Sequence, residues 1–353
     1  MYCPDYGFYE VKKDNLGRRG DFYTSVSVGE LFGQLLAFQF SHWLEADIEG
    51  PKSQARIVEA GAHDGKLARD ILAWLQTHRS KVFNHIEYCI VEPSARRQEW
   101  QKETLQSFAP RVRWVPGLQR LAGGDSTSAV SLPSLTGVIF SNELLDAMPV
   151  HRLGWNASEK KWFEWGVALE GDKFVWARCP DSLTRQSGGR SIFPSSIFHL
   201  PPSLLDVLPD GYTIETSPSA DNWWREASGM LQHGRLMTID YGLDSEGLIS
   251  PGRLHGTLRA YFRHHVADDV LANVGEQDLT AHVNFPVIQA AGESAGLTTE
   301  SFSTQAQFLT RILGEGVTDK SFGQWNASRT RQFQTLTHPD HLGRAFRVLI
   351  QKR

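Results

Sequence analysis

The stretch that decides the fold of this chain is Ala55-Arg56-Ile57-Val58-Glu59-Ala60-Gly61-Ala62-His63-Asp64-Gly65-Lys66-Leu67-Ala68. A short apolar run ends in an acid, Glu59, and a loop that carries Gly61 and Gly65 leads into a helical pattern. This order predicts a strand, a tight turn and a helix, the first unit of an open α/β nucleotide-binding sheet. Glycine suits the turn because the backbone bends sharply and approaches a ligand closely. An acid at the strand end suits hydroxyl or amine groups better than phosphate, so we interpret the stretch as the floor of a cofactor site.

Composition excludes several classes of protein. The 353 residues can bury a large core, and the net charge of -4 leaves no global basic field to recruit nucleic acid. Charged residues at 22% and hydrophobic residues at 41% are typical of a globular chain rather than a disordered one. No apolar run approaches the roughly 18 residues that a membrane span needs. We therefore expect neither nucleic acid binding nor membrane insertion.

Cysteine usage and the N-terminal sequence predict the compartment. The three cysteines, Cys3, Cys89 and Cys179, are odd in number and widely spaced. They indicate neither a disulfide framework nor a zinc site, so a reducing compartment is expected. Residues 1–6 lack the charged and apolar regions of a signal peptide. These observations favour a cytoplasmic protein.

A second strand is predicted at residues 88–91, and it runs into Glu92-Pro93-Ser94 before a helical stretch. In doubly wound sheets, an acid at this position holds the ribose hydroxyls of a nucleoside. Glu92 would then form a second wall of one crevice, opposite the Gly61 turn. The alternative is a solvated acid near a helix start, where the helix dipole favours it. A third strand is expected at residues 112–115.

The fourth predicted strand, residues 137–140, runs into Ser141-Asn142-Glu143-Leu144-Leu145-Asp146-Ala147-Met148-Pro149. Asn142, Glu143 and Asp146 would lie at the carboxyl end of the sheet, where ligands bind in open α/β folds. Helix capping could explain Asn142 alone. A fifth strand, residues 235–239, ends in Asp240.

The chain divides into three expected parts. Residues 1–149 hold an N-terminal segment and the cofactor-binding half of the core, 150–229 an inserted, tryptophan-rich β subdomain for the substrate, and 230–353 the second half of the core with a long loop excursion, 243–284. Most of the tryptophans are expected in the core. A helix is expected from Val28, capped by Ser27 with Glu30 three residues on. The final strand, residues 346–350, favours an antiparallel edge.

Five motifs occur in order along the chain: Gly20-Asp21-Phe22-Tyr23-Thr24-Ser25, Ser141-Asn142-Glu143-Leu144-Leu145-Asp146-Ala147-Met148-Pro149-Val150, Ile239-Asp240-Tyr241-Gly242, Leu258-Arg259-Ala260-Tyr261 and Gly275-Glu276-Gln277-Asp278-Leu279-Thr280-Ala281-His282-Val283-Asn284-Phe285. Together they resemble the MidA-like family, whose mitochondrial members are S-adenosylmethionine-dependent protein arginine methyltransferases that assist assembly of respiratory complex I. The resemblance implies a doubly wound, Rossmann-like methyltransferase sheet with an antiparallel last strand. It also implies S-adenosylmethionine as cofactor and a protein partner, such as a respiratory-complex subunit. It does not specify an oligomeric state.

The resemblance also assigns roles to residues. Glu92 would take the ribose hydroxyls, and Asn142 and Glu143 would lie beside the sulfonium. His63 stands where the family pattern Glu-x-Gly-x-Gly-x-Gly has its middle glycine, so its side chain is expected to crowd the cofactor or to replace a backbone contact. The full expected cofactor set is Asp21, Tyr23, Thr24, Glu59, Gly61, Ala62, His63, Gly65, Glu92, Pro93, Asn142 and Glu143.

Methylation of arginine would need a carboxylate. The guanidinium has a pKa above about 12 and no free lone pair until a proton leaves. A carboxylate that fixes the guanidinium and receives that proton fits the need. Glu143 is the first catalytic candidate, and Asp146 or Asp240 the second. The alternative for each is helix capping or loop hydrogen bonding.

Two other classes of function stay open. One is a binding or assembly protein that keeps the methyltransferase fold without catalysis, which His63 motivates. The other is a nicotinamide-dependent dehydrogenase, disfavoured because the first turn is not the full Gly-x-Gly-x-x-Gly. The histidines His264, His265 and His282 lack the spacing of metal ligands, so no metal site is predicted.

Overall fold

The structure, a computed structural model, describes residues 24–45, 55–122, 135–180, 202–262, 265–267, 269–318 and 320–353. The helices are α2 (Ser25–Val28), α3 (Leu31–Glu45), α4 (Lys66–His78), α5 (Ser80–His85), α6 (Ala95–Thr104), α7 (Pro202–Leu205), α8 (Pro218–Met230), α9 (Ser245–Leu248), α10 (Phe285–Ser294), α11 (Gln305–Thr318) and α12 (Ala327–Thr337), with short 3-10 turns η2 (Gln106–Arg111), η3 (Leu118–Ala122) and η5 (Pro251–Arg253). The strands are β1 (Ala55–Ala60), β2 (Ile86–Val91), β3 (Val112–Val115), β4 (Leu135–Asn142), β5 (His151–Asn156), β6 (Lys161–Glu170), β7 (Lys173–Arg178), β8 (Thr213–Thr216), β9 (Leu231–Leu243), β10 (Arg259–Phe262), β11 (His265–Ala267), β12 (Asp278–Thr280), β13 (Val283–Asn284), β14 (Thr298–Thr304) and β15 (Phe346–Lys352).

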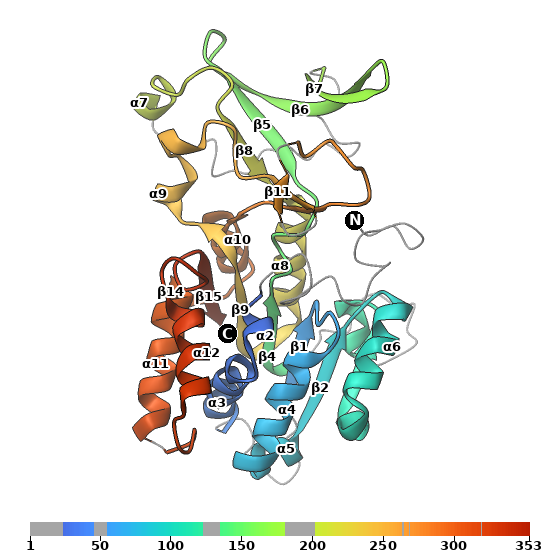
Figure 1. Ribbon diagram of the computed structural model, residues 1–353, viewed down its shortest axis with the longest axis vertical. Coiled ribbons are helices and arrows are strands. Elements are labelled where there is room, and N and C mark those ends of the chain that lie inside the picture. The colour runs from blue at the N-terminus through green and yellow to red at the C-terminus, as the bar shows by residue number, and fades with distance from the viewer. Residues whose placement is uncertain are drawn as a thin grey trace.

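The main sheet has the strand order β14-β15-β9-β4-β1-β2-β3, and β13 pairs with β9 (Figure 1). Within this sheet, the neighbouring pairs β3–β2, β2–β1, β1–β4 and β4–β9 are parallel, whereas β15 is antiparallel to both β9 and β14. The predicted doubly wound sheet with an antiparallel last strand is therefore confirmed. The last strand does not form the edge, however, because β14 adds outside it and completes its second ladder of hydrogen bonds.

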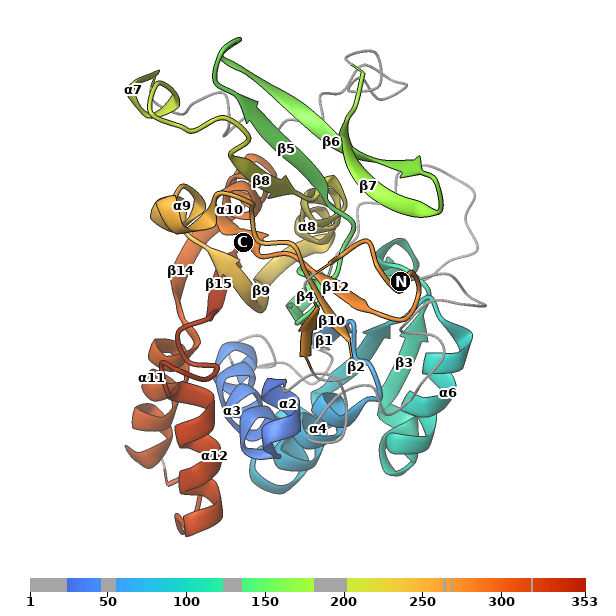
Figure 2. The same ribbon diagram turned by 45° about the horizontal axis from the view of Figure 1, so that its top comes forward.

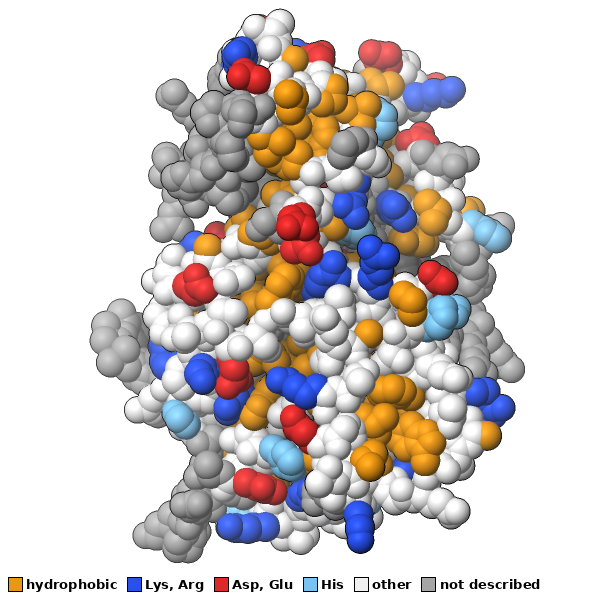
Figure 3. Space-filling view, turned by 90° about the vertical axis from the view of Figure 1, so that its left-hand side faces the viewer, with side chains coloured by type: hydrophobic (Ala, Val, Ile, Leu, Met, Phe, Trp, Pro, Cys, Tyr) orange, Lys and Arg blue, Asp and Glu red, His pale blue; other side chains and the backbone are white. Residues whose placement is uncertain are grey.

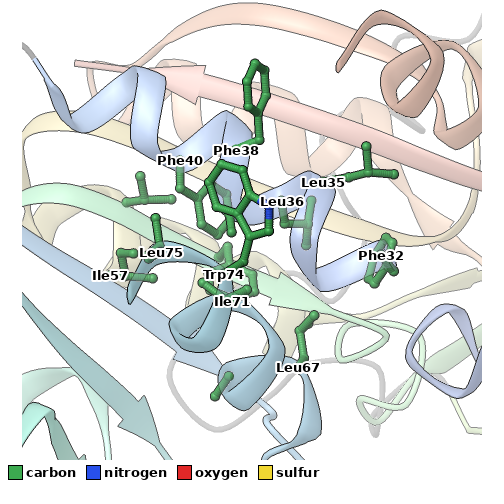
Figure 4. Close-up of a cluster of buried hydrophobic side chains, with 14 of the residues drawn as sticks. Phe32, Leu35, Leu36, Phe38, Phe40, Ile57, Leu67, Ile71, Trp74 and Leu75 are labelled. Carbon is green, nitrogen blue, oxygen red and sulfur yellow. The ribbon is translucent and has the colours of Figure 1, made fainter. Parts of the chain in front are cut away.

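Two hydrophobic layers cover the faces of this sheet. The first is built by α3, α4, α11 and α12, and it buries Phe38 and Trp74 with their rings 6.1 Å apart. Figure 4 shows the apolar side chains of α3 and α4 that meet in this layer. The second layer is built by α8 and α10, with Trp224 fully buried. Helices on both faces leave the carboxyl ends of β1, β2 and β4 as the open rim of the sheet.

The start of the N-terminal helical region differs from the sequence prediction. Thr24, not Ser27, is the N-cap of α2: the Ser27 N–H donates to Thr24 Oγ1 at 3.1 Å, and the Thr24 N–H donates to Ser27 Oγ at 3.0 Å. The capping box is therefore Thr24 with Ser27, and the predicted pair of Ser27 and Glu30 is wrong. A second helix, α3, begins two residues after Gly29. The reciprocal hydrogen bonds hold Thr24 beside the rim of the sheet.

Two smaller antiparallel sheets stand over the rim. One has the order β7-β6-β5-β8 and the other β11-β10-β12. In Figure 2 the three-stranded sheet lies between the four-stranded sheet and the main sheet. Figure 3 shows hydrophobic side chains exposed near the end of the molecule that carries the four-stranded sheet. Among the helices that the structure describes, none combines the length and apolarity needed to cross a bilayer.

Candidate active site

The turn after β1 has the backbone that the sequence predicts. Gly61 and Gly65 have φ angles of 78° and 82°, in the left-handed region that glycine adopts without strain. A Cβ atom on Gly61 would lie 2.9 Å from Cδ1 of Leu144, so a larger residue would require that side chain to shift. Gly65 is the N-cap of α4 and lines neither of the cavities described below. The turn thus brings bare backbone to the rim at Gly61.

His63 adopts the same left-handed backbone, with φ at 45°. Its carbonyl accepts a hydrogen bond from Nε2 of Gln101 at 3.0 Å, and its Nδ1 lies 3.8 Å from Oδ1 of Asp64. Burial raises the pKa of Asp64, but hydrogen bonds and charges from His63 and Lys66 outweigh it and hold that pKa well below its usual range. The histidine thus occupies a backbone position that favours glycine, and its side chain is anchored beside an ionised acid.

Two adjoining cavities open at the rim. The main cavity, about 780 Å³, is lined by Gly61, Glu92, Pro93, Glu143 and Asp146 among others. The side cavity, about 500 Å³, is lined by Glu59, Ala62 and Asn142 among others. Four residues line both: Thr24, Gly61, His63 and Glu143. The predicted cofactor residues thus converge on one place, except Gly65; Asp21 and Tyr23 lie outside the described residues.

Glu59 lines the side cavity and is 2% exposed. Burial raises the pKa of its carboxyl to about 7, against the hydrogen bond that Tyr88 Oη donates to Oε2 at 2.7 Å; the charge of Asp64 raises it further. The acid therefore lies in the interior at the end of β1, where one hydroxyl orients it.

Glu92 lines the main cavity at the end of β2 and is 1% exposed. Its Oε1 accepts the Ser94 N–H at 2.9 Å and pairs with Arg97 at 3.0 Å, and its Oε2 accepts a hydrogen bond from Gln101 at 3.2 Å. A carboxylate accepts hydrogen bonds from hydroxyl groups such as those of a ribose. The α6 contacts fix the orientation of the predicted ribose acceptor.

Glu143 directly follows β4 and has a left-handed backbone, with φ at 52°. Its Oε1 accepts hydrogen bonds from the Ser25 N–H and from Nδ2 of Asn142, both at 3.1 Å. Burial and then the charge of Asp146 raise the pKa of Glu143 to about 8, against these two hydrogen bonds. The Oδ1 of Asn142 is buried, and no described residue donates to it. The end of β4 thus brings together the Glu143 carboxyl, whose pKa is raised, and the Asn142 carbonyl oxygen, which accepts no hydrogen bond from the described residues.

Asp240 and Asp146 have different places. Asp240 is fully buried and lines neither cavity; its Oδ2 accepts the N–H groups of Leu144, Leu145 and Asp146 at 3.2, 2.8 and 3.4 Å. Asp146 lines the main cavity, and burial, followed by the charges of Asp240 and Asp278, raises its pKa. Burial also raises the pKa of Asp240. Asp240 therefore holds the turn after β4, while Asp146 faces the ligand space.

The three-stranded sheet adds residues to the main cavity that the sequence interpretation did not select. They are Arg259, Tyr261, Asp278 and Thr280, with His282 just beyond. In the β10–β12 ladder Tyr261 lies opposite Asp278, and Arg259 lies opposite Thr280. The motif at residues 275–285 was the available signal: its alternating polar residues indicate a strand with one face toward a polar space.

His282 lines the main cavity with a neutral imidazole ring. Burial lowers its pKa to about 4, and the charges of Arg259, Arg253 and Arg347 lower it further. Its ring stacks on Tyr241, with centroids 6.5 Å apart and planes 13° apart. A neutral imidazole can orient a polar group in the cavity without adding positive charge to it.

The geometry defines the class of protein. A glycine turn after β1, an acid after β2 and a polar β4 end meet at the rim of a sheet whose last strand is antiparallel. This combination is that of a Rossmann-like enzyme with a nucleoside cofactor, and a family model for S-adenosyl-L-methionine-dependent methyltransferases matches residues 35–303. The chain belongs to this family, the MidA-like S-adenosylmethionine-dependent methyltransferases.

Solved structures agree. A superfamily member from Burkholderia thailandensis, crystallised with bound S-adenosyl-homocysteine, is 30% identical with a TM-score of 0.79, covering all of this chain and 85% of that one. A native crystal structure of a protein of the same superfamily and organism has 28% identity and a TM-score of 0.74, covering 100% of this chain and 84% of that one.

Curated relatives carry more specific names. The Drosophila melanogaster protein arginine methyltransferase NDUFAF7 homolog, mitochondrial, is 27% identical, covering 98% of this chain and 78% of its own length. The human protein arginine methyltransferase NDUFAF7, mitochondrial, is 28% identical, covering 83% of this chain. The match spans 64% of the length of the human protein and 65% of the rat protein.

The names of these relatives overturn one expectation. They place the relatives in mitochondria, so the prediction of a cytoplasmic protein is wrong. The prediction used cysteine usage, which reports a reducing environment and does not distinguish the cytosol from the mitochondrial interior.

S-adenosylmethionine is the cofactor of this enzyme. The residues present fit it: Gly61 presents bare backbone to both cavities, Glu92 presents an oriented carboxylate, and Asn142 Oδ1 is a buried acceptor suited to a donor such as an amine. The cofactor supplies an electrophilic methyl carbon on a sulfonium.

Proposed function

We propose that this methyltransferase acts on an arginine side chain of a partner protein. The observation that carries the proposal is the group of carboxyls at the main cavity: Glu143, Asp146 and Asp278 all line it, and Asp146 and Asp278 are buried. Burial raises the pKa values of Glu143 and Asp146; the charge of Asp146 raises that of Glu143 further, and the charges of Asp240 and Asp278 raise that of Asp146 further. A guanidinium that entered would relieve the repulsion and could bind two carboxylate oxygens at once.

Glu143 is the proton acceptor in this proposal. It lies at the Gly61 side of the cavity, since it lines both cavities with Gly61, and its oriented Oε1 leaves Oε2 for the substrate. An acid with a pKa of about 8 holds a proton well at neutral pH once it has received one. Asp146 and Asp278 fix the guanidinium on the far side, and Asp240 positions the turn that carries Asp146. Most of the rate enhancement would come from orientation, a contribution that can reach about 7–11 kcal/mol.

The relatives support a proposal for the partner and the compartment. Their names support a protein substrate, and the MidA-like resemblance points to a subunit of a respiratory complex in mitochondria. In this proposal, residues 150–229 meet the substrate, and the 243–284 excursion closes the main cavity. The cofactor-binding part remains 1–149, and 230–353 completes the core.

His63 favours a second candidate, a protein that keeps the fold and binds the cofactor without turnover. A side chain at this left-handed position narrows the space beside Gly61, since His63 lines both cavities. Calorimetry with S-adenosyl-homocysteine, combined with a transfer assay, separates the two candidates. Binding without transfer to any protein would favour the silent form.

Methyl transfer to a mitochondrial protein extract tests the proposed function. The purified enzyme is incubated with the extract and isotope-labelled S-adenosylmethionine, and the labelled residues are mapped by mass spectrometry. We expect label on arginine of a small number of proteins. Label confined to lysine, to termini or to small molecules would overturn the arginine assignment.

A further inference from the structure

The hairpin of β6 and β7 exposes an apolar face. Leu169 pairs with Phe174 and Val167 with Trp176, and residues two apart on a strand share a face, so these four side chains lie together. Val167 is 53% exposed, Leu169 65% and Phe174 48%. Large apolar side chains gathered on a surface indicate a contact site more often than isolated ones do.

A loop and strand from a distant part of the chain form the other wall of a groove on this face. The groove, about 300 Å³, is lined by Val167, Phe174, Val270, Leu271, Ala272, Asn273, Val274, Gly275, Gln277 and Leu279. Val274 is 72% exposed. We call this space the apolar groove.

Gln277 gives the groove its shape and one unused acceptor. It is 4% exposed, and its Nε2 donates to the backbone carbonyls of Asp269 at 3.3 Å, Val270 at 3.5 Å and Ala272. These contacts fix the orientation of the amide, and they hold the loop in a preformed curve. Its Oε1 is buried, and no donor reaches it in the described part of the chain. An N–H group of a bound peptide backbone is a donor of the required kind.

Strand β12 separates the apolar groove from the main cavity. Asp278 and Thr280 line the main cavity, whereas Gln277 and Leu279 line the groove. Side chains alternate across a strand, so one short segment forms a wall of both spaces. The acids that would receive a guanidinium and the apolar surface are therefore one strand apart.

We propose that the apolar groove binds an extended, apolar segment of the protein substrate that flanks the methylated arginine. This inference rests on the proposed arginine methylation. A peptide is the one occupant that brings a guanidinium to the acids, apolar side chains to Val167, Phe174 and Val274, and backbone N–H groups to Gln277. The groove thus selects which arginine enters the main cavity, by the residues around it.

Two fluorescent peptides test the proposal. They have equal length and charge and one central arginine, flanked by valine and leucine in one peptide and by serine in the other. Fluorescence anisotropy with S-adenosyl-homocysteine present gives their affinities for the full chain. We expect the apolar peptide to bind about tenfold tighter, and we expect Val274→Asp and Phe174→Ser, one on each wall, to abolish that preference. The control is Val317→Asp on α11, since Val317 is 64% exposed and does not line the groove.

The outcomes separate the groove from the activity. Equal affinity for both peptides, or a preference that both groove variants retain, overturns the groove proposal, and the arginine assignment stands if the arginine is still methylated. A preference without methylation of arginine in the peptides or in the extract contradicts the proposed function, and with it the claim that the segment is a substrate. Sedimentation velocity adds a third check. A dimer that Val274→Asp dissociates would show that a second copy of the chain occupies the groove, and the proposal would be wrong.

Discussion

The backbone N–H of Ser25 donates a hydrogen bond to Oε1 of Glu143 at 3.1 Å, which joins the start of the described N-terminal region to the end of β4. Ser25 is buried, and its Oγ donates in turn to Oε1 of Gln305 on α11 at 3.1 Å. This bond occupies one carboxylate oxygen of Glu143, a residue that lines both cavities. The N-terminal region therefore orients the proposed proton acceptor as well as lining the site.

Glu143→Gln tests the role of that carboxylate. Glutamine keeps the acceptor for Ser25 but cannot take a proton, so we expect kcat to fall about a hundredfold or more. The Kd for S-adenosyl-homocysteine should stay within about twofold in calorimetry, since the fold of the turn is kept. Full activity in this variant would remove Glu143 from the mechanism.

The pH dependence follows from the raised pKa of Glu143, about 8. Below that pH the free enzyme carries a protonated Glu143, which cannot accept a proton, and above it the carboxylate is available. We expect kcat/KM for an arginine peptide to rise with pH and to level off above about 8, because kcat/KM reports groups of the free enzyme. The inflection should vanish in Glu143→Gln. A flat profile in the wild type would contradict the assignment.

Glu92→Ala tests the ribose wall. We expect the Kd for S-adenosylmethionine to rise at least about tenfold, which corresponds to about 1.4 kcal/mol. Glu87→Ala is the control, because Glu87 lies on β2, the strand that precedes Glu92, but it pairs with Arg56 and Arg113 and does not line the main cavity. Equal affinity in both variants would place the ribose elsewhere.

His63→Gly tests the departure from the family pattern. Glycine relieves a left-handed backbone that costs other residues about 1–2 kcal/mol, and it clears the space beside Gly61. We expect tighter binding of S-adenosyl-homocysteine and a higher midpoint of thermal unfolding. His63→Ala removes the side chain but keeps the strain, so it should gain affinity without gaining stability. Weaker binding in both variants would mean that the imidazole contacts the cofactor.

Asp240→Asn tests the positioning role of the acid behind the turn. Three backbone N–H groups donate to one of its carboxylate oxygens, and the backbone N–H of Tyr241 donates to the other at 2.9 Å. An amide replaces one of these acceptors by a donor, so we expect the free energy of unfolding to fall by about 1–3 kcal/mol in urea titrations. Asp146→Asn should cost less stability, because Asp146 lines the main cavity and its carboxyl accepts a backbone hydrogen bond from Ala147 rather than tying together several N–H groups of the turn. If both variants lost a similar free energy of unfolding, the positioning role of Asp240 would be contradicted.

The sequence predicted the part of the fold that depends on local patterns. The strands β1, β2 and β4 were predicted correctly, because each is a short apolar run in the sequence with a polar residue, Glu59, Glu92 or Asn142, at or next to its end. Helix α12 was missed, since its sequence has no clear apolar stripe and it is buried chiefly through Leu336. The cap at Thr24 was missed because two hydroxyl residues compete and only the path of the chain decides between them.

The site was predictable where it follows the strand order and not where it depends on long-range packing. Glu143 and Asp146 were candidates because they follow β4. The sequence could not show that Asp240, a catalytic candidate, instead holds the turn after β4. Its four backbone donors come from Tyr241 and from a turn about 95 residues earlier. Asp278 reaches the cavity only because β12 folds over the rim. The roles of all these residues remain predictions that the variants above test.

The measurement that tests the central claim most directly compares wild type and Glu143→Gln in methyl transfer to a mitochondrial extract. Labelled S-adenosylmethionine is used, the protein is hydrolysed completely, and the labelled amino acids are separated. The account predicts label in methylarginine with the wild type and almost none with Glu143→Gln, although both bind S-adenosyl-homocysteine. Equal methylarginine from the two proteins, or label only in other amino acids, would contradict it.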